Sequence, residues 1–286
     1  MITNQTRQKW NDFVMKNKLL TWLYVKYMQS FVHNMKRKDD KNHLKFYKRK
    51  GMFDWVAIET TDICTRRCEY CPLSQSPRKN FLDEIIFYRI LNELKEINYR
   101  GKICFSNYGG PLVDERLPIF VRKTREYFPD LFINMSTNGD LLTPEKFREI
   151  IDAGMNEICI TQHGDIEPNN HRRLKLELTD EEKKHIIWIN LNKDSLLSNR
   201  GGTVEVNSKR IAKKICYQTT LIIRADATIT LCCHDYFGEI TLGDLKKKSI
   251  MDIWDDSKNI AIRKNLYNGF AVNTMCKKCY LFQEAK

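Results

Sequence analysis

Apolar and polar residues follow two patterns that alternate along the chain after residue 50. Short apolar runs of the kind that form buried strands are predicted at Trp55–Thr60, Lys102–Asn107, Leu131–Ser136, Glu157–Thr161 and His185–Leu191. Between them, apolar residues spaced three and four apart predict helices at Asp83–Ile97, Pro118–Tyr127 and Thr143–Ala153, the last with Thr143 as its N-cap. This repeated strand-then-helix order predicts an α/β fold with a parallel sheet and right-handed crossovers.

Four loops follow the first four predicted strands and carry the candidate chemistry. They are the cysteine-bearing segment 64–71, then Asn107–Pro111, Thr137–Gly139 and Gln162–Gly164. Periodicity does not distinguish a barrel from an open doubly wound sheet, but both architectures bind ligands at the C-terminal ends of their strands. We therefore expect these four loops to share one rim of the sheet.

The character of the sequence changes after residue 191. Residues 192–215 are typical of a connection, punctuated by the glycine pair in SNRGG. Beyond it we predict strands at Leu221–Arg224 and Thr228–Leu231, a glycine-bearing loop, and a helix from Ile250 to Leu266. The predicted organisation is a helical arm and linker over 1–50, an α/β core over 51–195, a connection over 196–215 and a smaller domain over 216–286.

An amphipathic helix is predicted between Trp10 and Met35, in the most basic part of the chain. Residues 1–50 contain thirteen Lys or Arg and three Asp or Glu, so +10 of the net charge of +12 lies there and +2 in the rest. Because a nucleic-acid-binding domain carries its own basic face, the nearly neutral body argues against nucleic acid as a partner. We expect the arm to pack on the body or on a partner subunit, with an anionic membrane surface as the alternative.

The sequence also indicates in which cellular compartment the protein is found. The longest apolar stretch, LLTWLYV at 19–25, ends at Lys26 and is far shorter than the roughly 18 residues of a membrane span. The N-terminus shows no apolar core followed by a small-residue cleavage site. Ten cysteines in a chain long enough to bury a core without disulfides indicate a reducing compartment, so we expect a cytoplasmic protein.

Three cysteines, Cys64, Cys68 and Cys71, lie together just past the first predicted strand. Three thiolates do not complete a tetrahedral zinc site, but they hold three irons of a four-iron cubane and leave the fourth iron open. A zinc site that takes its fourth ligand from elsewhere is the alternative.

The C-x3-C-x2-C spacing, with Tyr70 before the last cysteine, resembles the radical S-adenosylmethionine superfamily. The resemblance implies a partial TIM-like (β/α) barrel and a 4Fe-4S cluster whose open iron binds the amino and carboxylate groups of S-adenosyl-L-methionine. Reductive cleavage of that cofactor then gives a 5'-deoxyadenosyl radical that abstracts hydrogen from the substrate. It also implies a one-electron donor such as flavodoxin or ferredoxin.

Further cofactor contacts follow from the same resemblance. NYGGP resembles the family's glycine-rich loop that meets the methionine amino group, although Tyr108 and Gly110 depart from the usual G-G-E-P; a simple glycine turn is the alternative. STNGD resembles the segment that contacts the ribose or carboxylate, with an ordinary asparagine-glycine turn as the alternative. His163 is a contact to cofactor or substrate, or a structural histidine. The candidate cofactor-binding residues are Tyr70, Tyr108, Gly109, Gly110, Pro111, Ser136, Asn138 and His163.

A second cysteine set lies near the C-terminus: Cys216, Cys232, Cys276 and Cys279. Four thiolates complete the ligands of an auxiliary 4Fe-4S cluster, and they suit a structural zinc equally well. We favour Cys232 over Cys233, since adjacent strand residues point to opposite faces. The remaining strand cysteines, Cys104 and Cys159, are predicted to be buried core residues.

This second set, with LSNRGG at 197–202, TQH at 161–163 and CKKC at 276–279, resembles the abbreviated SPASM or twitch subgroup. The resemblance implies a small C-terminal α+β iron-sulfur domain. It also implies a dehydrogenase that oxidises a secondary alcohol of an aminocyclitol, sugar or polyol and passes one electron to the auxiliary cluster.

The subgroup resemblance also suggests the substrate contacts. Arg200 is expected to meet the substrate hydroxyl, and His234 and Asp235 stand where the subgroup carries an acidic substrate contact. Three other functions stay open: a radical epimerase or dehydratase, a peptide-modifying maturase, and a zinc-stabilised nucleic-acid-binding module.

Overall fold

The computed structural model describes residues 52–191, 198–205, 216 and 218–279. The chain divides into two units, Met1–Met52 and Phe53–Lys286, and the fold described below is that of the second unit. The predicted arm helix between Trp10 and Met35 lies outside the described residues. No helix in the described ranges combines the length and the apolar character needed to cross a membrane.

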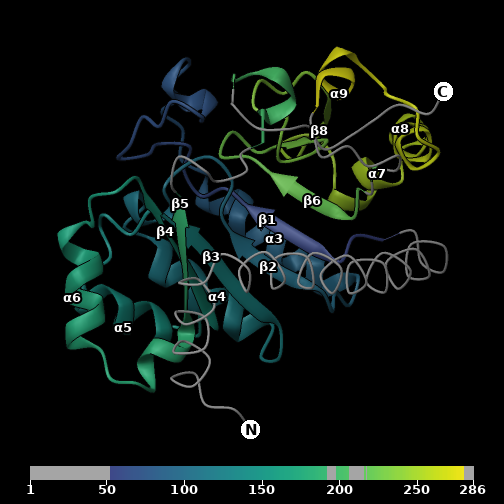
Figure 1. The fold of residues 1–286 in the computed structure, drawn as a ribbon. Helices are drawn as coiled ribbons and strands as arrows, with labels where there is room; N and C mark the ends of the chain where they lie inside the picture. The colour runs from purple at the N-terminus through teal and green to yellow at the C-terminus, as the bar shows by residue number, and fades with distance from the viewer. Residues whose placement is uncertain (1–51, 192–197, 206–215, 217, 280–286) are drawn as a thin grey trace, which may run out of the picture. The chain divides into compact units, whose positions relative to one another are not determined.

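One eight-stranded sheet organises the second unit (Figure 1), in the order β5-β4-β3-β2-β1-β6-β7-β8. Strands β1 to β6 pair in parallel, whereas β7 and β8 are antiparallel and extend the sheet beyond β6. The strand bounds are Trp55–Ile58 (β1), Lys102–Phe105 (β2), Phe132–Thr137 (β3), Glu157–His163 (β4), Ile186–Leu191 (β5), Thr220–Ile223 (β6), Thr228–Thr230 (β7) and Thr241–Asp244 (β8).

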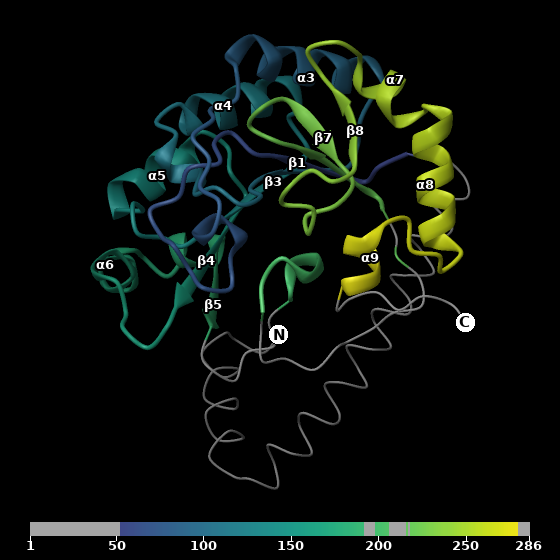
Figure 2. The same ribbon diagram turned by 90° about the horizontal axis from the view of Figure 1, so that it is seen from above.

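The helices connect successive strands, and four of them follow one side of the sheet in Figure 2. These four are α3 (Glu84–Glu96), α4 (Leu117–Tyr127), α5 (Pro144–Asp152) and α6 (Asn169–Glu177). The C-terminal helices are α7 (Ile250–Trp254), α8 (Ser257–Tyr267) and α9 (Thr274–Lys278). Short 3-10 helices lie at Pro72–Ser74 (η1), Pro111–Val113 (η2), Glu182–His185 (η3) and Arg200–Gly202 (η4).

The two faces of the parallel strands differ in polarity. Residues such as Ile133, Met135 and Ile158 are fully buried in the main core, which the amphipathic faces of the helices complete. The alternate residues form the opposite face, where Ser136 pairs with Cys159 and Thr161 with Ile189. Ile189 on that face is 40% exposed. Parallel sheets usually have both faces covered, so this open face leaves room for ligands near the rim.

The structure confirms the predicted strands and most predicted helices. Asp83 and Thr143 cap α3 and α5 through their side chains, which is why those two helices begin where the sequence predicts. The prediction for Cys159 was wrong: it is only half-buried on the open face of β4, whereas Cys104, on the same face of β2, is buried as predicted.

Three elements differ from the prediction. Helix α6 was missed because only His171 and Leu174 of it are buried, which leaves little apolar periodicity. Strand β8 was read as a loop because it is short and contains Gly243, where a Cβ would meet Ile253 at 2.5 Å. The single helix predicted from Ile250 to Leu266 is two helices, since Asp256 caps a new one at α8.

Candidate functional site

The first cysteine loop follows β1 and packs against loop 107–111. The Gly110 amide donates a hydrogen bond to the Ile63 carbonyl at 2.8 Å. A Cβ on Gly109 would stand 1.8 Å from the Thr61 carbonyl oxygen, and one on Gly110 would stand 3.6 Å from Cys64 Sγ. The two glycines therefore allow a backbone approach that no larger residue permits at Gly109.

Glu59, at the end of β1, holds loop 107–111 in place. Its carboxylate is 1% exposed and accepts hydrogen bonds from the amides of Tyr108 at 2.9 Å, Gly109 at 3.3 Å and Ala225 at 3.3 Å. Burial raises the pKa of Glu59 above its ordinary value, although these hydrogen bonds oppose the shift. This carboxyl joins β1, the glycine-rich loop and the segment after β6.

Arg66, inside the cysteine loop, is held by the loop that follows β3. Arg66 Nε donates to Asp140 Oδ2 at 2.7 Å, and Arg66 Nη2 donates to Asp140 Oδ1. The Thr65 hydroxyl donates to Asp140 Oδ2 at 3.0 Å and accepts from Asn138 Nδ2 at 2.9 Å. We call this network the Arg66–Asp140 clamp. Sequence reasoning missed both charged residues, because their partners lie 74 residues apart.

The loop that carries Asn138 is supported from behind by α6. His171 Nε2 donates to the Asn138 carbonyl at 2.7 Å, and its ring packs edge-on against Trp188. Gly139 has a φ of +73°, and a Cβ there would lie 2.5 Å from His171 Nε2. Glycine is thus required by both the left-handed conformation and the contact with His171. Since α6 was not predicted, His171 was missed as well.

Tyr70 and His163, both predicted cofactor contacts, lie together. The Tyr70 hydroxyl hydrogen-bonds His163 Nδ1, and the two rings stack with centroids 5.9 Å apart. Burial and the charge of Arg66 lower the pKa of His163. The His163 carbonyl accepts a bond from Arg66 Nη1 at 3.3 Å. Ser136 lies apart from this group, exposed on the open face and paired with Cys159.

The thiols of the first set share an aromatic environment. Cys64 and Cys71 pack against Leu73, Tyr108 and Tyr236, and all three thiols are free. Burial raises the pKa of Cys68 and of Cys71. Buried thiols of this kind lose their protons when a metal centre binds them, so the loop suits ligation.

The second cysteine set forms another cluster around α9. Its members Cys216, Cys232, Cys276 and Cys279 pack on a small apolar cluster made by Leu231, Leu266, Met275 and Cys276 itself. Cys233, in contrast, is exposed and does not belong to that cluster. Burial raises the pKa of Cys216 to about 11.

The seven cysteines of the two sets are all described, and their spacing bears on the metal. No three His, Cys, Asp or Glu side chains of the described residues are grouped so that they hold a single ion. Three thiols in the first set and four in the second are the ligand numbers of 4Fe-4S clusters with and without an open iron.

Arg200 lies between the two cysteine sets. Its loop is attached to α9 by the Asn199 side-chain amide, which donates to the Lys278 carbonyl at 2.8 Å. The Arg200 guanidinium lies 5.7 Å from the centre of the Tyr108 ring, which itself packs beside Cys71. The charge of Arg200 lowers the pKa of Cys71, against the larger opposing effect of burial. Arg200 therefore acts on Cys71 of the first set, and its loop is attached to α9, which carries Cys276 of the second set.

His234 and Asp235 differ in their surroundings. His234 is 8% exposed, and its Nδ1 lies 3.4 Å from Ser198 Oγ and 3.6 Å from Cys279 Sγ. Burial and Arg200 lower its pKa to about 4. Asp235 accepts bonds from the Thr230 hydroxyl at 2.8 Å and from the amides of residues 239 and 240 at 2.8 and 3.0 Å. The Asp235 carboxylate thus stabilises the loop that follows it through hydrogen bonds to residues 239 and 240.

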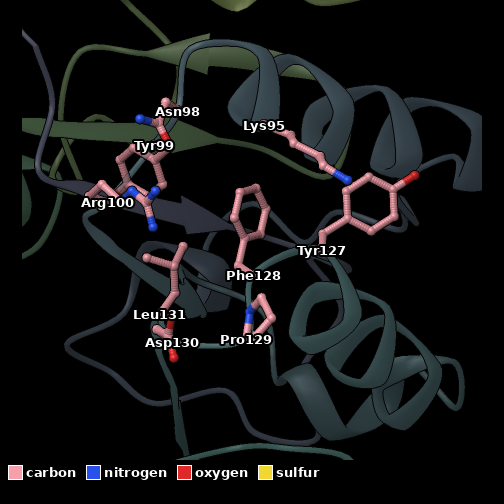
Figure 3. A pocket seen from close by; sticks show the side chains of 9 residues that line it. All are labelled: Lys95, Asn98, Tyr99, Arg100, Tyr127, Phe128, Pro129, Asp130 and Leu131. Atoms are coloured by element: carbon pink, nitrogen blue, oxygen red, sulfur yellow. The ribbon is translucent and has the colours of Figure 1, made fainter.

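A cavity of about 200 Å³ lies away from all of these residues. Figure 3 shows its lining, which comes from the segments that precede β2 and β3 and therefore lies at the N-terminal ends of those strands. The cysteine loop and its partners lie past the C-terminal ends. The lining residues are Lys95, Asn98, Tyr99, Arg100, Tyr127, Phe128, Pro129, Asp130 and Leu131.

Two protein families match the two halves of this site. Residues 58–184 match the Radical SAM superfamily, and residues 216–280 match the SPASM family, an iron-sulfur cluster-binding domain. Each match contains one of the two cysteine sets. The zinc alternative for both sets is therefore not supported.

Individual proteins resemble the chain, some over most of its length and others over a smaller part of it. The S-adenosyl-L-methionine-dependent 2-deoxy-scyllo-inosamine dehydrogenase of Niallia circulans is 28% identical over 234 residues, 80% of this chain and 93% of that protein. The crystal structure of BtrN in complex with AdoMet and 2-DOIA has a TM-score of 0.73 and 26% identity, over 80% of this chain and 93% of that one. The GTP 3',8-cyclase of Sulfurovum sp. is 30% identical, but over only 38% of this chain and 33% of the cyclase.

These findings confirm the predicted fold, a partial TIM-like barrel followed by a small SPASM-type domain. They also confirm the predicted cofactors, S-adenosyl-L-methionine with one SAM-binding and one auxiliary 4Fe-4S cluster. The chain therefore belongs to the radical S-adenosylmethionine superfamily, among the members that carry a C-terminal SPASM-type iron-sulfur domain.

Proposed function

We propose that this protein oxidises a secondary alcohol of an aminocyclitol, sugar or related polyol to a ketone. The observation that carries the proposal is the position of Arg200, a residue that binds hydroxyl and oxyanion groups. Its guanidinium lies near Tyr108 and the first cysteine set, and its loop is attached to α9 of the second set. Likeness to a 2-deoxy-scyllo-inosamine dehydrogenase over 93% of that protein supports the same reaction.

The cysteines define which part of the chain serves each cluster. In the proposal, Cys64, Cys68 and Cys71 hold the SAM-binding cluster, and Cys216, Cys232, Cys276 and Cys279 hold the auxiliary one. When bound, these groups supply hydrogen-atom abstraction at the carbinol carbon and a one-electron acceptor. One hydrogen atom leaves from the carbinol carbon, one electron passes to the acceptor, and the hydroxyl proton is released to solvent, which together account for the two electrons and two protons that an alcohol loses when it becomes a ketone.

Residues of the chain position the cofactor and the substrate. Glu59 fixes loop 107–111, whose backbone faces the first cysteine loop, which supports the proposal that Gly109, Gly110 and Pro111 contact the cofactor. Tyr70, His163 and Ser136 are the further candidate contacts. The Asn138 amide is already used on Thr65, so we propose that Asn138 acts by holding the cysteine loop.

Arg200 is the predicted contact to the substrate hydroxyl, and we propose Tyr108, which was predicted as a cofactor contact, as a second one. The Tyr108 hydroxyl is buried and makes no hydrogen bond within the described residues, so it has a donor and acceptor to offer. Arginine keeps its charge at physiological pH, so Arg200 donates to the substrate oxygen and stabilises negative charge there instead of taking the proton. His234 borders the same loop through Ser198.

The proposed reaction also requires an electron donor and a reducing compartment. Cleavage of S-adenosyl-L-methionine consumes an electron, so the proposal includes a one-electron donor of the flavodoxin or ferredoxin type. Ten cysteines without a disulfide among the described residues suit the cytoplasm, where thiols stay reduced. We propose further that the basic arm, residues 1–50, contacts a partner subunit or an anionic surface.

Anaerobic reconstitution tests the proposal. We expect about eight irons per chain, release of 5'-deoxyadenosine on reduction, and a ketone when aminocyclitols and polyols are supplied. Products with an inverted or missing hydroxyl and no ketone would point instead to an epimerase or a dehydratase. Modification of a peptide alone would point to a maturase. Bound zinc without cofactor cleavage would remove the radical chemistry altogether.

A further inference from the structure

His234 lies where the loop that carries Arg200 meets the last ligand of the second cysteine set. Its Nδ1 is 3.6 Å from Cys279 Sγ and 3.4 Å from Ser198 Oγ, and only 8% of the residue is exposed. The Ser198 hydroxyl oxygen also accepts a bond from the Arg200 amide at 3.2 Å. His234 is therefore fixed against a sulfur that is proposed to ligate iron.

The partners of Nδ1 decide which ring nitrogen carries the proton. A cysteine that ligates iron is a thiolate, and its sulfur only accepts hydrogen bonds. With the proton on Nδ1, His234 donates toward Cys279 Sγ and Ser198 Oγ together. The other tautomer would set the Nδ1 lone pair against the thiolate. The contact to Cys279 thus selects the Nδ1–H form.

We infer that His234 tunes the redox potential of the auxiliary cluster by donating an Nδ1–H hydrogen bond to the Cys279 sulfur. The reduced cluster carries one more negative charge than the oxidised cluster, so a donor to a ligand sulfur stabilises the reduced form more and raises the potential. The inference rests on the proposed function in that Cys279 and its partners must hold a cluster. His234 is then a positioning residue that acts through Cys279.

This role differs from the substrate contact that the subgroup resemblance suggests for position 234. A carboxylate there would have no hydrogen to donate to Cys279, whereas the imidazole has one. The neighbouring carboxylate, Asp235, is fully used within its own loop by Thr230 and two backbone amides. His234 thus acts on the auxiliary cluster, which accepts the electron, and a higher midpoint potential makes that cluster a better acceptor.

The test isolates the auxiliary cluster in the full-length chain. The substitutions Cys64→Ala, Cys68→Ala and Cys71→Ala remove the other cluster's ligands and leave the second set unchanged. In this background, His234→Leu removes the donor, while His234→Asn retains an N–H near the position of Nδ1. Substitution His185→Leu is the matched control, since His185 bonds the Asn156 carbonyl far along the sheet. The midpoint potential of each variant is measured by EPR-monitored redox titration.

We expect His234→Leu to lower the midpoint potential of the auxiliary cluster. At a fixed applied potential, the ratio of reduced to oxidised cluster should then fall at least threefold. That ratio corresponds to about 28 mV, at 59 mV per tenfold for one electron. His234→Asn should recover most of the shift, and His185→Leu should show none. If His234→Leu holds no cluster, the comparison of His234→Asn with His234→Gln, whose longer amide displaces the donor, gives the same test.

Two results overturn the inference. Equal midpoint potentials in all variants would show that His234 does not act on Cys279. The proposed function would still stand in that case if the enzyme with both cysteine sets intact forms the ketone. Failure of the parent to bind about four irons would overturn the auxiliary cluster itself, and the inference with it.

Discussion

Breaking the Arg66–Asp140 clamp should loosen the SAM-binding cluster and leave the auxiliary cluster intact. The substitution Asp140→Ala removes the acceptor of two Arg66 bonds and one Thr65 bond, in a pair whose side chains are 24% and 23% exposed. Charge-assisted hydrogen bonds contribute about 1.5–3 kcal/mol each when buried, and partial exposure screens them. We therefore expect a loss of about 2 kcal/mol in the stability of the closed loop, or about 30-fold in its population.

The assay separates the two clusters in one preparation. Reconstituted Asp140→Ala should retain close to four irons per chain where the wild type retains about eight, and should bind S-adenosyl-L-methionine at least tenfold more weakly. Asp140→Asn keeps one acceptor oxygen and should lie between the two. The control is Glu177→Ala, which breaks an equally paired but more exposed contact of Arg173. Full iron content and unchanged cofactor affinity in Asp140→Ala would refute the clamp.

Three further predictions address other parts of the site. Cys232→Ala should halve the iron content, whereas Cys233→Ala should retain about eight irons, because only Cys232 packs with the second set; iron analysis decides. Gly109→Ala should lower the free energy of unfolding by about 2–3 kcal/mol in denaturant titration, since its Cβ would stand 1.8 Å from the Thr61 carbonyl. Glu59 has a folded-state pKa above its unfolded one, so its contribution to stability is present below about pH 4.5 and is lost as pH rises through the folded value. In denaturant titrations across pH 4–8, Glu59→Gln should not show this loss of stability with rising pH. Identical pH profiles of stability for Glu59→Gln and the wild type would contradict the prediction.

The sequence predicted the features that depend on local pattern. Strands and their rim loops follow from apolar periodicity, so the gathering of the rim loops at one end of the sheet was expected. The two cysteine sets follow from their composition and spacing along the chain. The helix starts at Asp83 and Thr143 were equally readable, because capping is a local interaction.

The features that sequence reasoning missed depend on contacts between distant segments. Arg66 is one basic residue among many until the fold brings Asp140 against it, and His171 belongs to a helix with only two buried residues. Asp235 was a candidate substrate contact because it directly follows position 234, where the subgroup carries an acidic contact. Its hydrogen bonds to residues 239 and 240 appear only in the folded loop.

The central claim is that the protein oxidises an alcohol through a carbon-centred hydrogen abstraction. The most direct measurement uses a substrate with deuterium on the carbinol carbon and follows both products by mass spectrometry. We predict one 5'-deoxyadenosine carrying one deuterium for each ketone formed, with one S-adenosyl-L-methionine consumed each time. Deuterium that returns to an alcohol product without consumption of the cofactor, or 5'-deoxyadenosine that carries none, would contradict the account.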